Sequence, residues 1–130
     1  MTSDETIRGK RILVVEDERI IAGLLCDMLR GDGHDVEAVD TGRAALDKLA
    51  AGDWDLIVSD LRMPVLDGRG LYRALETHYP HMLSRIMFVT GSALDAGNDN
   101  FLVSAKVPWL AKPFTMRALH EMSQKVLRNL

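Results

Sequence analysis

Residues 54–68, which read WDLIVSDLRMPVLDG, decide the fold of this chain. Residues 56–58 form a short apolar run without alternation, which is typical of a strand in a parallel sheet that is covered on both faces. Asp60 follows this run and lies in a loop that Pro64 and Gly68 are expected to turn away from the sheet. Because ligands bind at the carboxyl ends of parallel strands, this carboxylate is expected where chemistry takes place.

Four other segments have the composition of strands, namely residues 12–15, 34–40, 84–89 and 107–111. Between them, apolar residues recur three and four positions apart in segments 20–29, 44–50, 68–75 and 115–130, which predicts amphipathic helices. Segment 92–106 is different, because residues 93–100 contain Gly97 and several Asn and Asp residues that favour turns over helix. Only a short or mobile helix around Phe101 and Leu102 is expected there.

Strand and helix alternate five times, which predicts an α/β fold of parallel β-α-β units with helices on both faces of the sheet. The expected architecture is a flavodoxin-like, doubly wound (βα)5 three-layer sandwich with strand order 2-1-3-4-5. Residues 1–9 are polar and are expected to form a flexible leader, with residues 10–130 as the single domain.

The composition narrows the function classes. The net charge is −3 and there is no basic cluster, so the chain lacks the electrostatic footprint of a protein that binds nucleic acid directly. Aliphatic runs reach about four residues, against the ~20 that cross a bilayer, so no membrane insertion is expected. There is a single cysteine, Cys26, and no signal peptide. These features predict a cytoplasmic protein.

The predicted strand order brings together the ends of the first and third strands, and with them three carboxylates, those of Glu16, Asp17 and Asp60. Three such groups repel one another unless a cation lies among them. Oxygen ligands without His or Cys select a hard ion, so Mg²⁺ is the expected cofactor, with Mn²⁺ as a substitute. Thr90 ends the fourth strand and Lys112 follows the fifth, so both are expected to face the same pocket. This set can hold a phosphoryl group, and one carboxylate can act as its nucleophilic acceptor.

At these positions the sequence resembles the receiver domain of bacterial two-component response regulators. Four motifs carry the resemblance in chain order: Val14-Val15-Glu16-Asp17-Glu18, Ser59-Asp60-Leu61-Arg62-Met63-Pro64 with Asp67-Gly68, Val89-Thr90-Gly91, and Lys112-Pro113-Phe114. Segment 107–114 is also similar to receivers attached to hybrid sensor histidine kinases. The resemblance spans residues 10–130, and both a stand-alone receiver and a piece of a longer protein remain open.

The resemblance implies a signalling domain that is not an enzyme beyond its own phosphotransfer and autodephosphorylation. Asp60 would accept the phosphoryl group from a sensor histidine kinase or a histidine phosphotransfer protein. Asp17 would bind Mg²⁺ directly and Glu16 mainly through water, with the backbone carbonyl of Arg62 as a further ligand. The downstream effector remains unknown.

The resemblance also implies how a signal leaves the site. Thr90 would bond to the phosphoryl group and shift with it, and Lys112 would pair with that group before a cis peptide at Pro113. The surface of the fourth helix, fifth strand and fifth helix would then switch. Trp109 is either the aromatic residue that moves in this switch or a packed aromatic of an edge strand.

Two other classes use similar parts. Phosphatases of the haloacid dehalogenase class also form an aspartyl phosphate, but they have Asp-x-Asp at the first strand, where this chain has Glu16-Asp17. A flavodoxin-like binding module needs a phosphate loop rich in Ser, Thr and Gly after that strand, and this loop is absent. The histidines lack metal-ligand spacing and are expected at the surface, namely His34, His78, His81 and His120.

Overall fold

The computed structural model describes residues 6–63, 66–91 and 96–129, and its centre is a parallel sheet. The strands are β1 (Arg11–Val15), β2 (Asp35–Val39), β3 (Leu56–Ser59), β4 (Ile86–Thr90) and β5 (Trp109–Ala111). They pair in the order β2-β1-β3-β4-β5, which confirms the predicted order. Pro64, which was expected to turn the loop after β3, lies outside the described residues.

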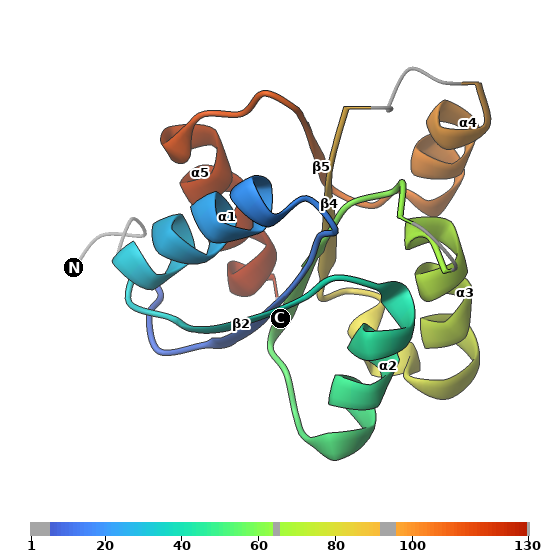
Figure 1. Ribbon diagram of the computed structural model, residues 1–130, viewed down its shortest axis with the longest axis horizontal. Coiled ribbons are helices and arrows are strands. Elements are labelled where there is room, and N and C mark those ends of the chain that lie inside the picture. Colours follow the sequence, from blue (N-terminus) through green and yellow to red (C-terminus); the bar gives the residue numbers. More distant parts are fainter. Residues whose placement is uncertain (1–5, 64–65, 92–95, 130) are drawn as a thin grey trace.

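Helices cover both faces of the sheet, which confirms the three-layer sandwich. They are α1 (Arg19–Gly31), α2 (Gly42–Ala51), α3 (Gly68–His78), α4 (Ala96–Ala105) and α5 (Met116–Arg128), with a 3₁₀ turn, η1, at Pro80–Met82. Helices α1 and α5 lie on one face, and α2, α3 and α4 on the other (Figure 1). No helix in the described part of the chain is long and apolar enough to cross a membrane.

The core consists of two apolar layers, one on each face of the sheet. Successive side chains of a strand point to opposite faces, so each central strand supplies both layers. Leu13 and Val15 of β1 pack into the layer shared with α2, α3 and α4, and Ile12 and Val14 pack into the layer shared with α1 and α5. This double burial is why the strands read as continuous apolar runs.

Two boundaries differ from those that the sequence predicts. The turn expected in residues 93–100 is wrong from Ala96 onward, because α4 already begins there. Asn and Asp are disfavoured inside helices but favoured near their amino-terminal ends, and Phe101 and Leu102 anchor the following turn in the core. Strand β5 is also shorter than expected and begins at Trp109 rather than Val107.

The segment before β1 contacts the domain at two places, the side chain of Gln124 and the backbone of Gly33. Gln124, which is buried on α5, accepts a hydrogen bond from the Ile7 N–H at 2.7 Å and donates one to the Ile7 carbonyl at 2.9 Å. The Gly9 N–H donates to the Gly33 carbonyl at 2.9 Å. The chain therefore contacts α5 three residues before Lys10, the position at which the sequence was expected to enter the fold.

The expectation that every histidine lies at the surface is wrong for His34, whose exposed fraction is 6%. Its Nδ1 accepts a hydrogen bond from the Lys10 N–H at 3.2 Å, so the neutral ring carries its proton on Nε2. Nε2 is buried and has no hydrogen-bond partner among the described residues. The His34 ring instead packs inside the fold and holds the backbone at Lys10, directly before β1.

Burial lowers the pKa of His34, an effect that the nearby Asp32 carboxylate opposes and His120 reinforces. In the unfolded chain the His34 ring takes up a proton below about pH 6.5, but in the folded protein it does so only at lower pH. The unfolding free energy should therefore fall as the pH decreases through about 6.5. We expect His34→Gln to lose less unfolding free energy than wild type between about pH 7.5 and about pH 5.5. Urea denaturation at both pH values measures this, with the exposed His78→Gln as the matched control. Equal pH dependence in wild type and His34→Gln would contradict the prediction.

Candidate functional site

The site is assembled by backbone pairing that continues past the ends of the strands. The Glu16 N–H donates to the Val39 carbonyl at 3.0 Å, and the Asp60 N–H donates to the Val15 carbonyl at 3.0 Å. On the other side of the site, the Lys112 N–H donates to the Thr90 carbonyl at 2.9 Å. Each of these positions is therefore held by the sheet itself.

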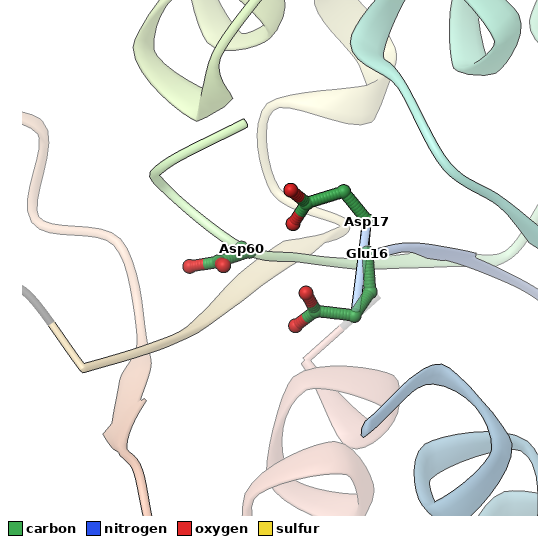
Figure 2. A group of neighbouring side chains, drawn as sticks. All are labelled: Glu16, Asp17 and Asp60. Carbon is green, nitrogen blue, oxygen red and sulfur yellow. The ribbon is translucent and has the colours of Figure 1, made fainter. Parts of the chain in front are cut away.

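Three carboxylates meet at this edge of the sheet (Figure 2). One oxygen each from Glu16, Asp17 and Asp60 lies within 4.8 Å of the others. Glu16 and Asp60 are buried, with exposed fractions of 2% and 6%, whereas Asp17 is exposed. The group is therefore closed toward the sheet and open to solvent at Asp17.

Lys112 links the two buried carboxylates. Its Nζ lies 2.7 Å from Glu16 Oε1 and 3.2 Å from Asp60 Oδ2. Glu18 Oε1 is 3.6 Å from the same nitrogen, and the Glu18 N–H donates to Glu16 Oε2 at 3.1 Å. One cation thus faces three carboxylates directly, and the pocket keeps an excess of negative charge.

The pKa shifts of Glu16 and Lys112 reflect this excess of negative charge. Burial raises the pKa of Glu16, and the Asp60 carboxylate raises it further, although the hydrogen bonds from Lys112 and from the Glu18 N–H act in the opposite direction. Burial alone would lower the pKa of Lys112, but the carboxylates of Glu16 and Asp60 outweigh it and raise that pKa above its ordinary value. Both shifts indicate that the pocket favours additional positive charge.

The loop that carries Asp60 is held against α3 by a close backbone contact at Gly68. The Gly68 N–H donates to the Leu61 carbonyl at 2.8 Å, and a Cβ at Gly68 would lie 2.6 Å from the Asp60 carbonyl oxygen. Asp67 caps α3 by accepting a hydrogen bond from the Gly70 N–H at 2.9 Å. The Asp-Gly pair therefore starts the helix and lets the Asp60 loop lie against it.

Asp17 and Asp60 open into a hollow of about 250 Å³, which also has Thr90 and Lys112 in its lining. Thr90 is buried at the end of β4. The Arg62 N–H donates to Asp60 Oδ1 at 3.4 Å. The Lys112–Pro113 peptide is cis, as the resemblance implied. The structure thus places Asp17, Asp60, Arg62, Thr90 and Lys112 around one hollow, with Glu16 in contact with Lys112, while their chemical roles stay predictions.

The structure also shows where Trp109 and Glu18 lie relative to this hollow. Trp109 does not line this hollow. It contributes to a groove at the amino-terminal end of β5, and 37% of the Trp109 surface is exposed. Glu18 precedes α1, but its side chain makes no capping bond and faces Lys112. No local pattern distinguishes a charge at a helix terminus from a partner of Lys112, because both place an acidic residue directly after a strand.

The donor set fits a hard divalent cation. Mg²⁺ binds through carboxylate oxygens and retains water molecules, and such an ion offsets the repulsion among closely spaced carboxylates. Glu16, Asp17 and Asp60 offer oxygen atoms at a suitable mutual spacing, and the exposed Asp17 leaves room for water. A buried carboxylate, a lysine and a hydroxyl around such an ion are groups that can serve phosphoryl transfer.

Comparisons with known proteins agree with this geometry. The sequence profile of the response regulator receiver domain matches residues 12–124. The chain is 38% identical over 112 residues to the response regulator protein FleR of Pseudomonas aeruginosa, covering 86% of this chain but only 23% of FleR. It is 33% identical over 118 residues to the response regulator receiver protein CpdR of Brucella abortus, covering 91% of this chain and 97% of CpdR.

Solved structures share the fold. The receiver domain of the sensor histidine kinase PA1611 from Pseudomonas aeruginosa superposes with a TM-score of 0.83 at 30% identity, covering 92% of this chain and 98% of that one. That structure holds a magnesium ion coordinated in its active site cleft.

Proposed function

Since this chain belongs to the receiver domain family of two-component response regulators, which serve phosphorylation-based signalling, we propose that Asp60 is its phosphoacceptor. The donor is the phosphohistidine of a sensor histidine kinase or of a histidine phosphotransfer protein. The Asp60 carboxylate attacks phosphorus, the bond from phosphorus to the histidine nitrogen breaks, and the imidazole leaves with the electron pair. The cytoplasmic location expected from the sequence is part of this proposal.

One observation carries the proposal, namely that Asp60 shares Lys112 with Glu16 at 3.2 and 2.7 Å while opening into a hollow. A nucleophile for phosphoryl transfer needs positive charge beside it to offset the oxygens of the incoming group. The ammonium group of Lys112 supplies part of this positive charge, because it already lies beside Asp60. Thr90, which lines the same hollow, supports a role as hydrogen-bond donor to a phosphoryl oxygen.

Glu16, Asp17 and Asp60 would hold Mg²⁺, with the backbone carbonyl of Arg62 as a fourth protein ligand. When bound, the ion supplies the positive charge that allows the anionic phosphoryl group to approach these carboxylates. Asp17 would hold the ion from the solvent-facing side of the site, and Glu16 keeps Lys112 in position through their 2.7 Å contact. The chemistry is limited to phosphorylation and dephosphorylation of the domain itself, and we propose no activity on other substrates.

The surface beside the site supports a protein donor. Ile20 and Leu24 lie one turn apart on α1, which begins directly after the Glu16-Asp17-Glu18 loop, and their exposed fractions are 80% and 45%. Exposed apolar side chains beside a reactive group favour contact with another protein over access by water alone. We place the phosphodonor on this face.

Magnesium dependence tests the proposed site. We expect the purified protein to become labelled by radioactive acetyl phosphate in millimolar Mg²⁺, and labelling in EDTA to fall about tenfold or more, because the carboxylates then repel the phosphoryl group. Mn²⁺ should restore labelling. Phosphoprotein is measured after gel filtration at fixed times. Equal labelling in EDTA and Mg²⁺, or none in either, would contradict the proposal.

Phosphorylation is proposed to change the surface formed by α4, β5 and α5. Thr90 pairs in register with Ala111, two residues after Trp109 on β5, so a shift at Thr90 acts on the strand that carries this indole. We expect the Trp109 fluorescence maximum to shift when acetyl phosphate and Mg²⁺ are added. Trp54→Phe removes the emission of the buried second tryptophan. An unchanged spectrum in this variant, at a measured high level of phosphorylation, would leave Trp109 as a packed aromatic of an edge strand.

A further inference from the structure

The structure has a groove of about 540 Å³ at the amino-terminal end of β5, separate from the carboxylate pocket. One wall comes from the end of α4 and the other from α5, which lie on opposite sides of the sheet (Figure 1). We call it the β5 groove and define it by Lys106, Val107, Trp109, Met122 and Lys125. Its size is that of a site for a few side chains.

The groove borders an open sheet edge. Strand β5 is the last strand of the sheet, and its residues pair in register with β4 as Phe88 with Trp109 and Thr90 with Ala111. The Phe88 N–H donates to the Pro108 carbonyl, and the Lys112 N–H donates to the Thr90 carbonyl. In a parallel ladder this pattern turns the backbone groups of Trp109 and Ala111 away from β4. Within the described ranges, no other strand takes up these groups.

The groove is positively charged. Lys106 and Lys125 are both exposed, and neither forms an ion pair with any described residue. Other exposed cations in the described residues do form ion pairs, for example Lys48 with Glu37 and Arg117 with Glu121. Two unpaired lysines on opposite walls, with apolar surface from Val107, Trp109 and Met122 between them, match an anionic peptide better than a neutral one.

We propose that the β5 groove binds an extended, acidic segment of a partner protein, which adds to the sheet as a sixth strand beside β5. Backbone groups of the segment would pair with those of Trp109 and Ala111. Successive side chains of an extended segment point to opposite sides. Two adjacent acidic residues would therefore reach Lys106 on one wall and Lys125 on the other, while flanking apolar residues contact Trp109 and Met122.

A second copy of this chain does not fit the same edge. Residues 107–112, which β5 of a second copy would present, read VPWLAK and contain no carboxylate to pair with Lys106 or Lys125. The occupant is thus a different protein. The inference rests on the proposed output role of the α4, β5 and α5 surface, because it names the chemistry of the partner that this surface binds.

Fluorescence polarisation with synthetic peptides tests the inference on the unphosphorylated protein without Mg²⁺. The probe is a labelled peptide of sequence Val-Thr-Val-Asp-Glu-Val-Thr-Val. We expect binding to weaken about tenfold or more when Asp-Glu is replaced by Asn-Gln. A second peptide, Val-Thr-Asp-Val-Glu-Val-Thr-Val, places both acids on one side and should also bind more weakly than the probe. A version with N-methylated backbone groups should not bind, because it cannot pair with the edge.

Protein variants locate the site. The double variant Lys106→Glu with Lys125→Glu should bind the probe about tenfold or more weakly. The matched control, Arg19→Glu with Arg43→Glu, makes the same change in net charge at exposed residues outside the groove and should bind as wild type does. Peptide-induced shifts of the Trp109 and Ala111 amide signals in NMR spectra should accompany binding.

Three outcomes would overturn the inference: no binding of the probe, equal loss of binding in both double variants, or dimerisation of the protein through β5. The assay needs neither Asp60 nor Mg²⁺. A failure of phosphorylation with intact peptide binding would therefore remove the proposed function and leave this site, and the reverse result would do the opposite.

Discussion

Asp60→Asn is expected to reduce labelling by acetyl phosphate to background, about a hundredfold or more below wild type. An amide is a poor nucleophile and forms no acyl phosphate, whereas asparagine keeps the size of aspartate and can still accept a hydrogen bond from Lys112. The substitution removes one attraction to Lys112 and one repulsion with Glu16, which act in opposite directions on folding. We therefore expect the unfolding free energy to change by less than about 1 kcal/mol.

Two further variants make this result specific. Asp53→Asn alters an exposed carboxylate before β3, at the end of the strand opposite to Asp60, and should be labelled as fully as wild type. Asp17→Asn removes a proposed metal ligand but leaves the acceptor, so labelling should weaken and recover as Mg²⁺ is raised. Time courses of phosphoprotein formation, with urea denaturation of each variant, measure both effects. Label that persists in Asp60→Asn would place the acceptor elsewhere.

Lys112→Met is expected to give the largest loss of stability, about 2–3 kcal/mol in unfolding free energy at neutral pH. Glu16 and Asp60 are buried, and the substitution removes the cation that lies 2.7 and 3.2 Å from their oxygens. Breaking a buried charge cluster by removal of one partner leaves the others without compensation. Labelling should also fall, because the positive charge beside Asp60 is lost.

The matched control is Lys48→Met. Lys48 is paired with Glu37 at 2.9 Å, but both side chains are 42% exposed, and exposed pairs contribute less than about 1 kcal/mol. Urea denaturation of both variants compares a buried with an exposed lysine of similar geometry. Similar losses in the two variants would show that the pocket does not depend on Lys112 for its charge balance.

Mg²⁺ and low pH should each restore part of the stability that the Lys112→Met variant loses. Burial already holds the pKa of Glu16 above its ordinary value, and loss of the Lys112 hydrogen bond removes an influence that lowers it. A group with a raised pKa binds its proton more tightly in the folded state, so the variant should regain stability relative to wild type as the pH falls. Mg²⁺ should stabilise the variant more than wild type, because the ion no longer competes with the lysine. Absence of both effects would contradict the charge argument.

The part of the site that was predictable depends on local patterns repeated along the chain. Apolar runs followed by Glu16-Asp17, Asp60, Thr90 and Lys112 each mark the carboxyl end of a strand, and the alternation of strands and helices specifies the order of those strands. Their convergence follows from the right-handed crossovers of parallel units. Local pattern was sufficient for this step, because a strand that is buried on both faces must be apolar throughout.

Other features depend on which residues meet across the fold. Glu18 faces Lys112, the His34 ring accepts a bond from the Lys10 N–H, and Gln124 holds the backbone of Ile7. These pairs are separated by 94, 24 and 117 positions in the chain, so no local pattern indicates them. The same is true of α4, where turn-forming residues near its start adopt helix because Phe101 and Leu102 are anchored in the core.

The amino-acid sequence by itself determined the fold class, the strand order and the set of side chains at the ends of the strands, because burial on both faces leaves a continuous apolar signal in every central strand. Only the tertiary structure decided how charge is distributed within that set. It showed that Lys112 lies between two buried carboxylates while Asp17 faces solvent, and that β5 leaves an open edge between two unpaired lysines. Charge balance and edge exposure depend on distances between distant segments, and these distances arise only when the sheet is assembled.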